Sequence, residues 1–226
     1  MASLQVVSHW FESSIAHYHK FIMNNFTAIP AFASYIFCLD VKENFSRIVN
    51  LQNEIEYWEI LQPGEAKSAG STTQYILDDF IREKNILMKY FNELKNNVLE
   101  YNSTDFKMTT SWITKTNPGG YSKSHNHGNS FMSGVFYYDD YDDASSAILF
   151  EPQNFPKNTF QILADNTNNY NCTNIQIFPQ KNLLILFPSY LYHKITYNNS
   201  DKARYSLAFN ISPVGKIGCD DSCIVL

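Results

Sequence analysis

From residue 106 onward, the hydrophobic and polar positions follow one another in short runs separated by turn residues. The runs lie at 106–116, 130–140, 146–152, 175–179, 182–189, 192–198 and 204–212. Short alternating or apolar runs of this kind are typical of strands, and no helical pattern stands between them. Strands joined without helices pair in antiparallel fashion, so the pattern predicts an antiparallel sandwich or barrel.

The first hundred residues have a different pattern, and we interpret them as mainly helical. The segment 72–101 carries apolar residues near helical spacing, and Ser71 or Thr72 can cap it. Its apolar stripe should pack on the sheet, and consists of Ile76, Phe80, Ile86, Phe91, Leu94 and Val98. A second helix is expected within 41–60, a loop at 61–73 because of its Pro-Gly and Ala-Gly pairs, and a strand followed by a helix at 4–21.

We therefore expect a single domain in 1–226. In this scheme 1–105 is mostly helical support, 106–213 is the β core, and 214–226 is a loose tail. The final four residues, CIVL, have the form of a prenylation motif, but an acidic stretch precedes them instead of a basic one.

Composition narrows the class of protein. The chain has 226 residues, 44% hydrophobic and 15% aromatic, with a net charge of −5. An acidic chain does not favour nucleic acid as a partner. No run is long enough for a membrane span. The start of the chain lacks the pattern of a secretion signal, so its four cysteines, which form no CxxC pair, are expected to be reduced thiols in the cytoplasm.

Three histidines are the candidate metal ligands. His125 and His127 lie two residues apart in SHNHGNS, and residues i and i+2 of a strand point to the same face. His193 follows the turn PSYLY and opens the next strand, where a jelly roll would bring it to the same mouth of the barrel. Imidazole suits Fe, Zn, Ni and Cu. The remaining histidines, near the N-terminus, are interpreted as surface or packing residues: His9, His17 and His19.

An arginine on a strand built for burial is the second candidate. Arg204 precedes the apolar run of RYSLAFN, and Ser206 lies on the same face. A buried guanidinium is costly unless it is paired. It therefore either binds a ligand carboxylate in a two-pronged manner, with help from Ser206, or forms an internal bridge. The candidates for such a bridge are Asp139, Asp140, Asp142 and Asp143.

Taken in order, these motifs resemble the 2-oxoglutarate/Fe(II)-dependent oxygenases, and most closely a bacterial and phage group. The matching residues are Trp112, Gly119 or Gly120, HNH at 125–127, SGVFYY at 133–138, LFEP at 149–152, LFPS at 186–189, His193 and RYSLAFN at 204–210. The resemblance implies a double-stranded β-helix (jelly roll) over about 106–213. It also implies Fe(II) at His125, His127 and His193, and the far carboxylate of 2-oxoglutarate at Arg204 and Ser206.

The activity that the resemblance implies is a dioxygenase reaction, in which an unknown substrate, a small molecule or a protein, is hydroxylated and succinate and CO2 are released. One residue departs from the pattern, because the superfamily has a carboxylate ligand where His127 stands. Either three histidines hold the iron, or one of the pair is not a ligand and water or an acid such as Glu151 or Asp139 completes the site.

Two other classes remain open. A cupin-like metalloenzyme would also have an HxH pair, but its glutamate should stand at 131 or 132, where this chain has Phe131 and Met132. A non-catalytic β-barrel could use the histidines for binding alone. Arg204 discriminates between the classes: an arginine buried toward the histidines indicates the oxygenase, whereas one paired with an acid indicates the others. The HNH nucleases share only the three letters.

Overall fold

The computed structural model describes residues 22–23, 26–27, 34–60, 66–152, 165–166 and 171–226. The chain divides into two compact units, 1–35 and 36–226. Within the first unit, β1 (Ile22–Met23) and β2 (Phe26–Thr27) pair in antiparallel fashion. The strand and helix expected at 4–21 lie outside the described residues. Whether the chain acts as a single domain stays a prediction.

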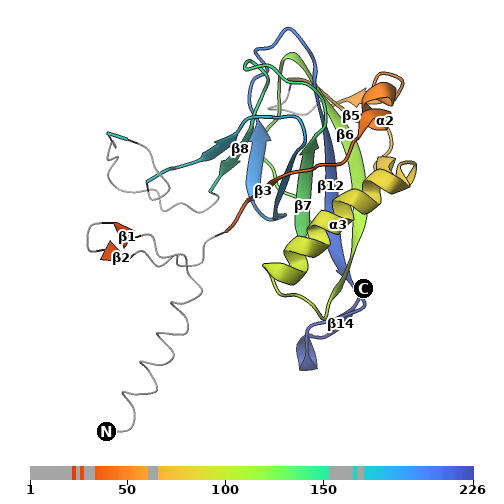
Figure 1. Cartoon of the computed structure of the whole chain (residues 1–226), viewed down its shortest axis with the longest axis vertical. Coiled ribbons are helices and arrows are strands. Elements are labelled where there is room, and N and C mark those ends of the chain that lie inside the picture. Colours follow the sequence, from red (N-terminus) through yellow and green to blue (C-terminus); the bar gives the residue numbers. More distant parts are fainter. Residues whose placement is uncertain (1–21, 24–25, 28–33, 61–65, 153–164, 167–170) are drawn as a thin grey trace. The chain divides into compact units, whose positions relative to one another are not determined.

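The second unit is a double-stranded β-helix, as expected (Figure 1). Its major sheet has the order β3-β10-β7-β12-β6-β5-β4, and its minor sheet has the order β11-β8-β9. The strands of the major sheet are β3 (Phe37–Asp40), β4 (Tyr57–Glu59), β5 (Ala66–Ser71), β6 (Asp105–Tyr121), β7 (Met132–Tyr137), β10 (Leu183–Pro188) and β12 (Arg204–Val214). The minor sheet contains β8 (Ile148–Glu151), β9 (Ile175–Ile177) and β11 (Tyr192–Ile195), and all these strands pair antiparallel.

Two apolar clusters hold the layers together. Between the sheets, side chains from β7, β8 and β10 pack on one another: Val135, Tyr137, Ile148, Phe150, Ile185 and Phe187. On the other face of the major sheet lies the larger cluster, to which α3 (Ile81–Asn97) contributes Leu87, Phe91 and Leu94. Figure 1 shows α3 running across this sheet, as the sequence predicts. The strands of the β-helix are therefore buried on both faces where the site forms.

The helix begins later than the apolar spacing predicts. Ser71 ends β5 instead of capping a helix, since its hydroxyl accepts a hydrogen bond from the Ile113 N–H at 3.1 Å and donates to the Thr73 carbonyl at 2.9 Å. A 3-10 turn, η1 (Ile76–Asp78), then leads to α3. Ile76 still contributes to the core, but Val98 at the far end is 61% exposed. Strand pairing thus takes precedence over helical periodicity at this point.

The interpretation of the first hundred residues as mostly helical is wrong for the part that the structure describes. Within 41–60 only α2 (Ser46–Leu51) is helical, and β4 follows it. Half of the loop expected at 61–73 is β5. Both strands extend the major sheet past β6, because each can complete its backbone hydrogen bonds only on a neighbouring strand. Sheet extension of this kind leaves little trace in the hydrophobic pattern.

The C-terminal segment is not a loose tail. β13 (Lys216–Ile217) and β14 (Ile224–Val225) form a small hairpin around η2 (Asp220–Ser222). The Gly215 N–H donates to the Leu226 carbonyl at 2.8 Å and closes the hairpin. The last four residues are exposed. No helix in the described part of the chain is long and apolar enough to span a membrane.

Gly134 gives a direct test of how tightly the β-helix is packed. A Cβ at this position would lie 2.2 Å from the ring of Phe209, which is 1% exposed. We expect Gly134→Ala to lower the free energy of unfolding by about 1–3 kcal/mol, the usual cost of overpacking a core. Denaturant titration measures this change. Gly70→Ala is the matched control, since a Cβ at Gly70 meets nothing within 4 Å; equal losses in the two variants would contradict the packing argument.

Candidate active site

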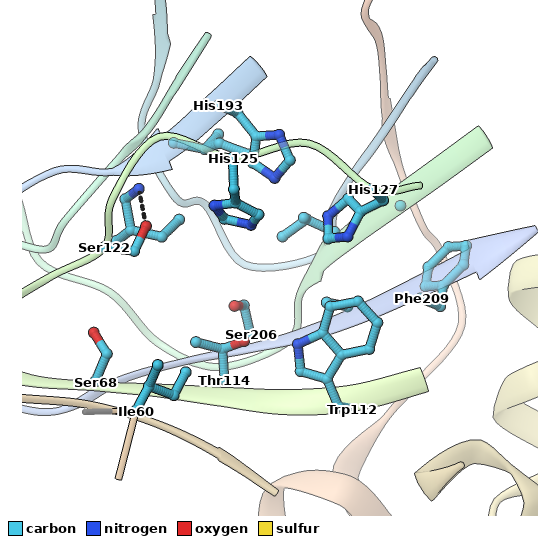
Figure 2. A pocket seen from close by; sticks show the side chains of 15 residues that line it. Ile60, Ser68, Trp112, Thr114, Ser122, His125, His127, His193, Ser206 and Phe209 are labelled. Atoms are coloured by element: carbon cyan, nitrogen blue, oxygen red, sulfur yellow. Dashed lines mark hydrogen bonds between the residues drawn. The ribbon is translucent and has the colours of Figure 1, made fainter. Parts of the chain in front are cut away.

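A cavity of about 120 Å³ lies between the two sheets and contains all three candidate histidines (Figure 2). Its floor is the inner face of β6 and β12, where Thr114 pairs with Ser206 and Trp112 pairs with Ala208. The lining residues are Ile60, Ser68, Trp112, Thr114, Ser122, His125, His127, Gly134, Val135, Ile148, His193, Ile195, Ser206, Ala208 and Phe209. None of them except the histidines can carry a charge.

Backbone hydrogen bonds place the histidines opposite the floor. His193 lies on β11, and the chain after β6 joins it through an isolated bridge, in which the N–H of each of His125 and His193 donates to the other's carbonyl at 2.9 Å. The N–H of His127 donates to the Ser189 carbonyl at 3.0 Å. The ring centroid of His193 lies 4.5 Å from that of His125 and 5.1 Å from that of His127. Figure 2 shows the three rings converging above Ser206 and Trp112.

The ring nitrogens are oriented as metal ligands require. Nδ1 of His125 lies 3.0 Å from the Lys123 carbonyl, and Nδ1 of His193 lies 3.0 Å from the Leu191 carbonyl. A carbonyl only accepts, so both Nδ1 atoms carry the proton and the Nε2 lone pairs remain available. One ligand atom from each histidine lies within 4.8 Å of the others. Neighbouring nitrogens about 2.1 Å from one ion are about 3 Å apart, so the side chains would have to rotate toward one another to bind it.

Burial keeps the imidazoles of His127 and His193 neutral. Desolvation, and then the nearby His125, lower the pKa of His127 to about 4. Desolvation, again followed by His125, lowers the pKa of His193 to about 3. A neutral imidazole is the form that binds a metal. At neutral pH His127 and His193 therefore offer uncharged nitrogen donors.

No carboxylate from the described residues joins the three histidines in a metal-binding cluster. Glu151 instead accepts a hydrogen bond from Lys194 at 2.6 Å, and Asp139 accepts one from Gln52 at 2.7 Å. The donor set that the structure brings together is therefore three imidazoles. The N-terminal histidines at 9, 17 and 19 lie outside the described residues.

Arg204 is buried next to the cavity, with 1% of its surface exposed, and is not itself one of the residues that line the cavity. It starts β12 on the same face as Ser206, opposite Thr116 of β6. Its Nη2 donates to the Tyr137 hydroxyl at 2.9 Å, its Nη1 lies 3.5 Å from the Thr116 hydroxyl, and its guanidinium carbon lies 4.9 Å from the centre of the Tyr137 ring. Its Nε has no hydrogen-bond partner.

No ion pair connects Arg204 with any Asp or Glu that the structure describes. Its predicted acidic partners bond elsewhere: Asp140 pairs with Lys181 at 2.8 Å, and Asp142 accepts from Ser200 at 2.6 Å. The internal-bridge alternative is therefore not what the structure contains. Burying a charged guanidinium whose Nε–H has no hydrogen-bond partner is unfavourable in free energy. An anionic ligand that accepted this hydrogen bond would offset the penalty.

Three further residues belong to the site but were not assigned a binding role from the sequence. Tyr137 and Thr116 flank Arg204, and the ring of Trp112 lies 5.6 Å from that of His127. The spacing of Thr116 and Trp112 along β6 could have indicated a shared face with the floor. Tyr137 could not be found this way, because every residue of β7 is buried and its apolar run shows no alternation.

The fold and the candidate site together combine a double-stranded β-helix, three converging imidazoles and a buried arginine without an acidic partner among the described residues. Residues 110–210 match the family model described as "Putative 2OG-Fe(II) oxygenase". This match confirms the resemblance seen in the sequence for residues 110–210, which form a little under half of the chain and carry all the candidate site residues; the substrate is unknown. The match and the acid-free Arg204 both favour the oxygenase over the cupin interpretation. No curated protein matches the chain.

Solved structures of the same fold include three informative neighbours. A 2OG-Fe(II) oxygenase family oxidoreductase from Burkholderia pseudomallei has a TM-score of 0.51 at 10% identity, over 74% of this chain and 78% of that one. HygX from Streptomyces hygroscopicus, with nickel, 2-oxoglutarate and hygromycin B bound, has a TM-score of 0.53 at 11% identity, over 80% and 83%. A prolyl hydroxylase from Trichoplax adhaerens has a TM-score of 0.54 at 10% identity, over 78% and 82%. At these identities the likeness establishes the fold alone.

Proposed function

We propose that this chain binds Fe(II) through His125, His127 and His193, and 2-oxoglutarate through Arg204 and Ser206, in order to hydroxylate a substrate. The observation that carries the proposal is Arg204, because its buried guanidinium has an unpaired Nε and no acidic partner among the described residues. It lies on the same face of β12 as Ser206, which lines the cavity together with the three histidines.

The three imidazoles would hold an iron ion, because one ligand atom of each lies within 4.8 Å of the others. Two of them have the Nδ1 proton fixed by a backbone carbonyl, so Nε2 faces the cavity. Since none of the three donors is a carboxylate, the site adds no negative charge to the metal. A dianion such as 2-oxoglutarate is then the group that neutralises it. The ligand set itself favours a dicarboxylate in this cavity.

Arg204 and its neighbours form the other end of the binding site. The guanidinium offers a planar, two-pronged donor surface that matches a carboxylate. The hydroxyls of Ser206, Thr116 and Tyr137 lie around it and can donate to the same carboxylate. This end of the cavity would orient the far carboxylate of 2-oxoglutarate, so that its oxo-acid end lies toward the histidines.

When they are bound, iron and 2-oxoglutarate supply the oxidising power for hydroxylation, with release of succinate and CO2. The protein positions these groups and excludes water from the cavity. Trp112, Phe209 and Ile148 surround the histidines with apolar surface. Water is thereby kept away from the reacting carbon of the substrate, and neutral His127 and His193 take no part in proton transfer at neutral pH.

The direct test of the proposed function is anaerobic loading of the protein with Fe(II), followed by metal analysis and an assay of succinate release with 2-oxoglutarate and oxygen. We expect one iron per chain and slow succinate formation that depends on both iron and 2-oxoglutarate. Iron binding without any consumption of 2-oxoglutarate would instead support a metalloenzyme that does not use this cosubstrate.

Substitution of His127 decides between the three-histidine site and a site with two histidines. We expect His127→Ala to weaken Fe(II) binding by at least about tenfold, because loss of a direct ligand costs no less than loss of a residue that supports one. His127→Asp should recover part of this loss, since a carboxylate is also an iron ligand. The measurement is competition with a metal chelator. Unchanged affinity in His127→Ala would remove His127 from the ligand set.

We also propose that the protein works in the cytoplasm, a reducing compartment. Its four cysteines are free thiols, and three of them, Cys38, Cys219 and Cys223, are exposed. Exposed thiols of this kind persist where reductants are abundant.

A further inference from the structure

The inner face of the major sheet continues past the cavity onto β5 and β4. Hydrogen-bonded partners across neighbouring strands point to the same face, and the register Trp58–Gly70–Thr114–Ser206 crosses four strands in one row. Thr114 and Ser206 line the cavity. Trp58 and Gly70 therefore lie on the same face as the histidine cavity, at its β4 end. Ile60, two residues after Trp58, also lines the cavity.

This end of the floor is open. Among the described residues the minor sheet has three strands and the major sheet seven, so these three strands cannot cover the whole inner face. Trp58 is 68% exposed, and a Cβ added to Gly70 would meet nothing within 4 Å. A glycine inside a strand weakens it, and often marks a place where a ligand approaches the backbone closely. The result is a flat floor at Gly70, bordered by the exposed indole of Trp58.

The size of the cavity indicates what this floor is for. A volume of about 120 Å³ is well below the roughly 300–1,000 Å³ of pockets that enclose a whole ligand. With 2-oxoglutarate also inside, only a small part of a substrate can reach the histidines. The rest of the substrate must lie outside the cavity. Ile60 and Ser68 line the cavity, and each lies two residues from Trp58 or Gly70, so the Trp58–Gly70 floor adjoins the cavity directly.

We propose that Trp58 and Gly70 form a substrate-binding platform, in which an uncharged, flat ring of the substrate lies over Gly70 against the indole of Trp58. This proposal rests on the proposed function, because it takes the histidine cavity as the place of reaction. The row Trp58–Gly70–Thr114–Ser206 contains no charged residue, and the cavity lining has none besides its histidines. The ring is therefore neutral, with hydroxyls such as that of Thr114 available to its edge.

An aromatic ring and a sugar ring share the flat apolar face that stacks on an indole, so the experiment tests both. The protein is labelled with 5-fluorotryptophan, and its three tryptophans are assigned by single Trp→Phe variants. It is titrated, alone and with Zn(II) and 2-oxoglutarate, with p-cresol, with methyl β-D-glucopyranoside and with linear N-propylacetamide. We expect one of the ring compounds to shift the Trp58 resonance saturably, and the linear amide to leave it unchanged.

Gly70→Val is the decisive variant, because the Cβ of its side chain meets nothing within 4 Å and the side chain would extend into the space of the ring. It should weaken binding of the ring compound at least about tenfold, and Trp58→Ala should weaken it about three- to tenfold by ligand-observed NMR. The control is Tyr75→Ala, which removes an aromatic residue that is 57% exposed at another place and should change nothing.

Two results would overturn the platform. One is a Trp58 resonance that responds to neither ring compound, and the other is equal binding in wild type and Gly70→Val. Both are distinct from failure of the proposed function, since the titration of the protein alone requires no metal. Gly70→Val should also bind Fe(II) and 2-oxoglutarate as wild type does, because no atom of Gly70 contacts the histidines or Arg204.

Discussion

His193→Ala should lower the bound Fe(II) from one ion per chain to nearly none. His193 is the most buried of the three candidate ligands, at 4% exposed, and its ring lies within 5.1 Å of both others. Removing it leaves two ligands from a single segment of chain and none from the minor sheet. Metal analysis after anaerobic loading and gel filtration measures the effect.

Asn126→Ala is the matched control for this prediction. Asn126 lies between His125 and His127 but is exposed, because alternate residues of an extended chain point in opposite directions. It should retain its full content of iron. Full iron retention in His193→Ala would place the metal elsewhere in the protein.

Arg204→Ala should weaken 2-oxoglutarate binding by about 30-fold or more, because loss of one partner of a buried, hydrogen-bonded charge pair costs about 2–5 kcal/mol. Arg204→Lys keeps the charge but loses the two-pronged geometry, so its affinity should lie between that of wild type and that of Arg204→Ala. Ser206→Ala removes one hydroxyl and should cost only a few-fold. The measurement is titration of 2-oxoglutarate into the anaerobic Fe(II) protein.

Iron content is the control for these variants. Arg204 contacts Tyr137 and Thr116, and no hydrogen bond joins it to a histidine of the site. Each Arg204 variant should therefore bind Fe(II) as wild type does, which also shows that it is folded. If Arg204→Ala bound 2-oxoglutarate with unchanged affinity, the arginine would have a purely structural role.

The β core and its site could be predicted from the sequence because each strand and each site residue is marked by a pattern within its own short segment. Each strand from β6 to β12 coincides with an apolar or alternating run, and the i, i+2 spacing of His125 and His127 already places two rings on one face. Arg204 stands out as a charge in an apolar strand, which only a paired or ligand-binding arginine explains.

The first hundred residues were harder to predict for a physical reason. β4 and β5 are strands because they add to the edge of a sheet formed by residues far along the chain, and AKSAGS has no alternating apolar pattern of its own. Ser71 could cap a helix equally well by its chemistry, but here it serves the β5–β6 pairing. Tertiary context therefore decides structure that the local pattern leaves open.

Tyr137 shows the same limit within the site. Its hydroxyl accepts a hydrogen bond from Arg204, yet in the sequence it is one of several aromatic residues in a continuous buried run. Only the register of β7 against β12 determines which of them reaches the guanidinium.

The central claim is that iron and 2-oxoglutarate bind together in the cavity between the histidines and Arg204. The most direct measurement is the absorption spectrum of the anaerobic Fe(II) protein during titration with 2-oxoglutarate. The account predicts a charge-transfer band from the chelate that saturates at one 2-oxoglutarate per iron, is absent in His193→Ala, and needs far more 2-oxoglutarate in Arg204→Ala. An iron-loaded wild-type protein that develops no such band would contradict it.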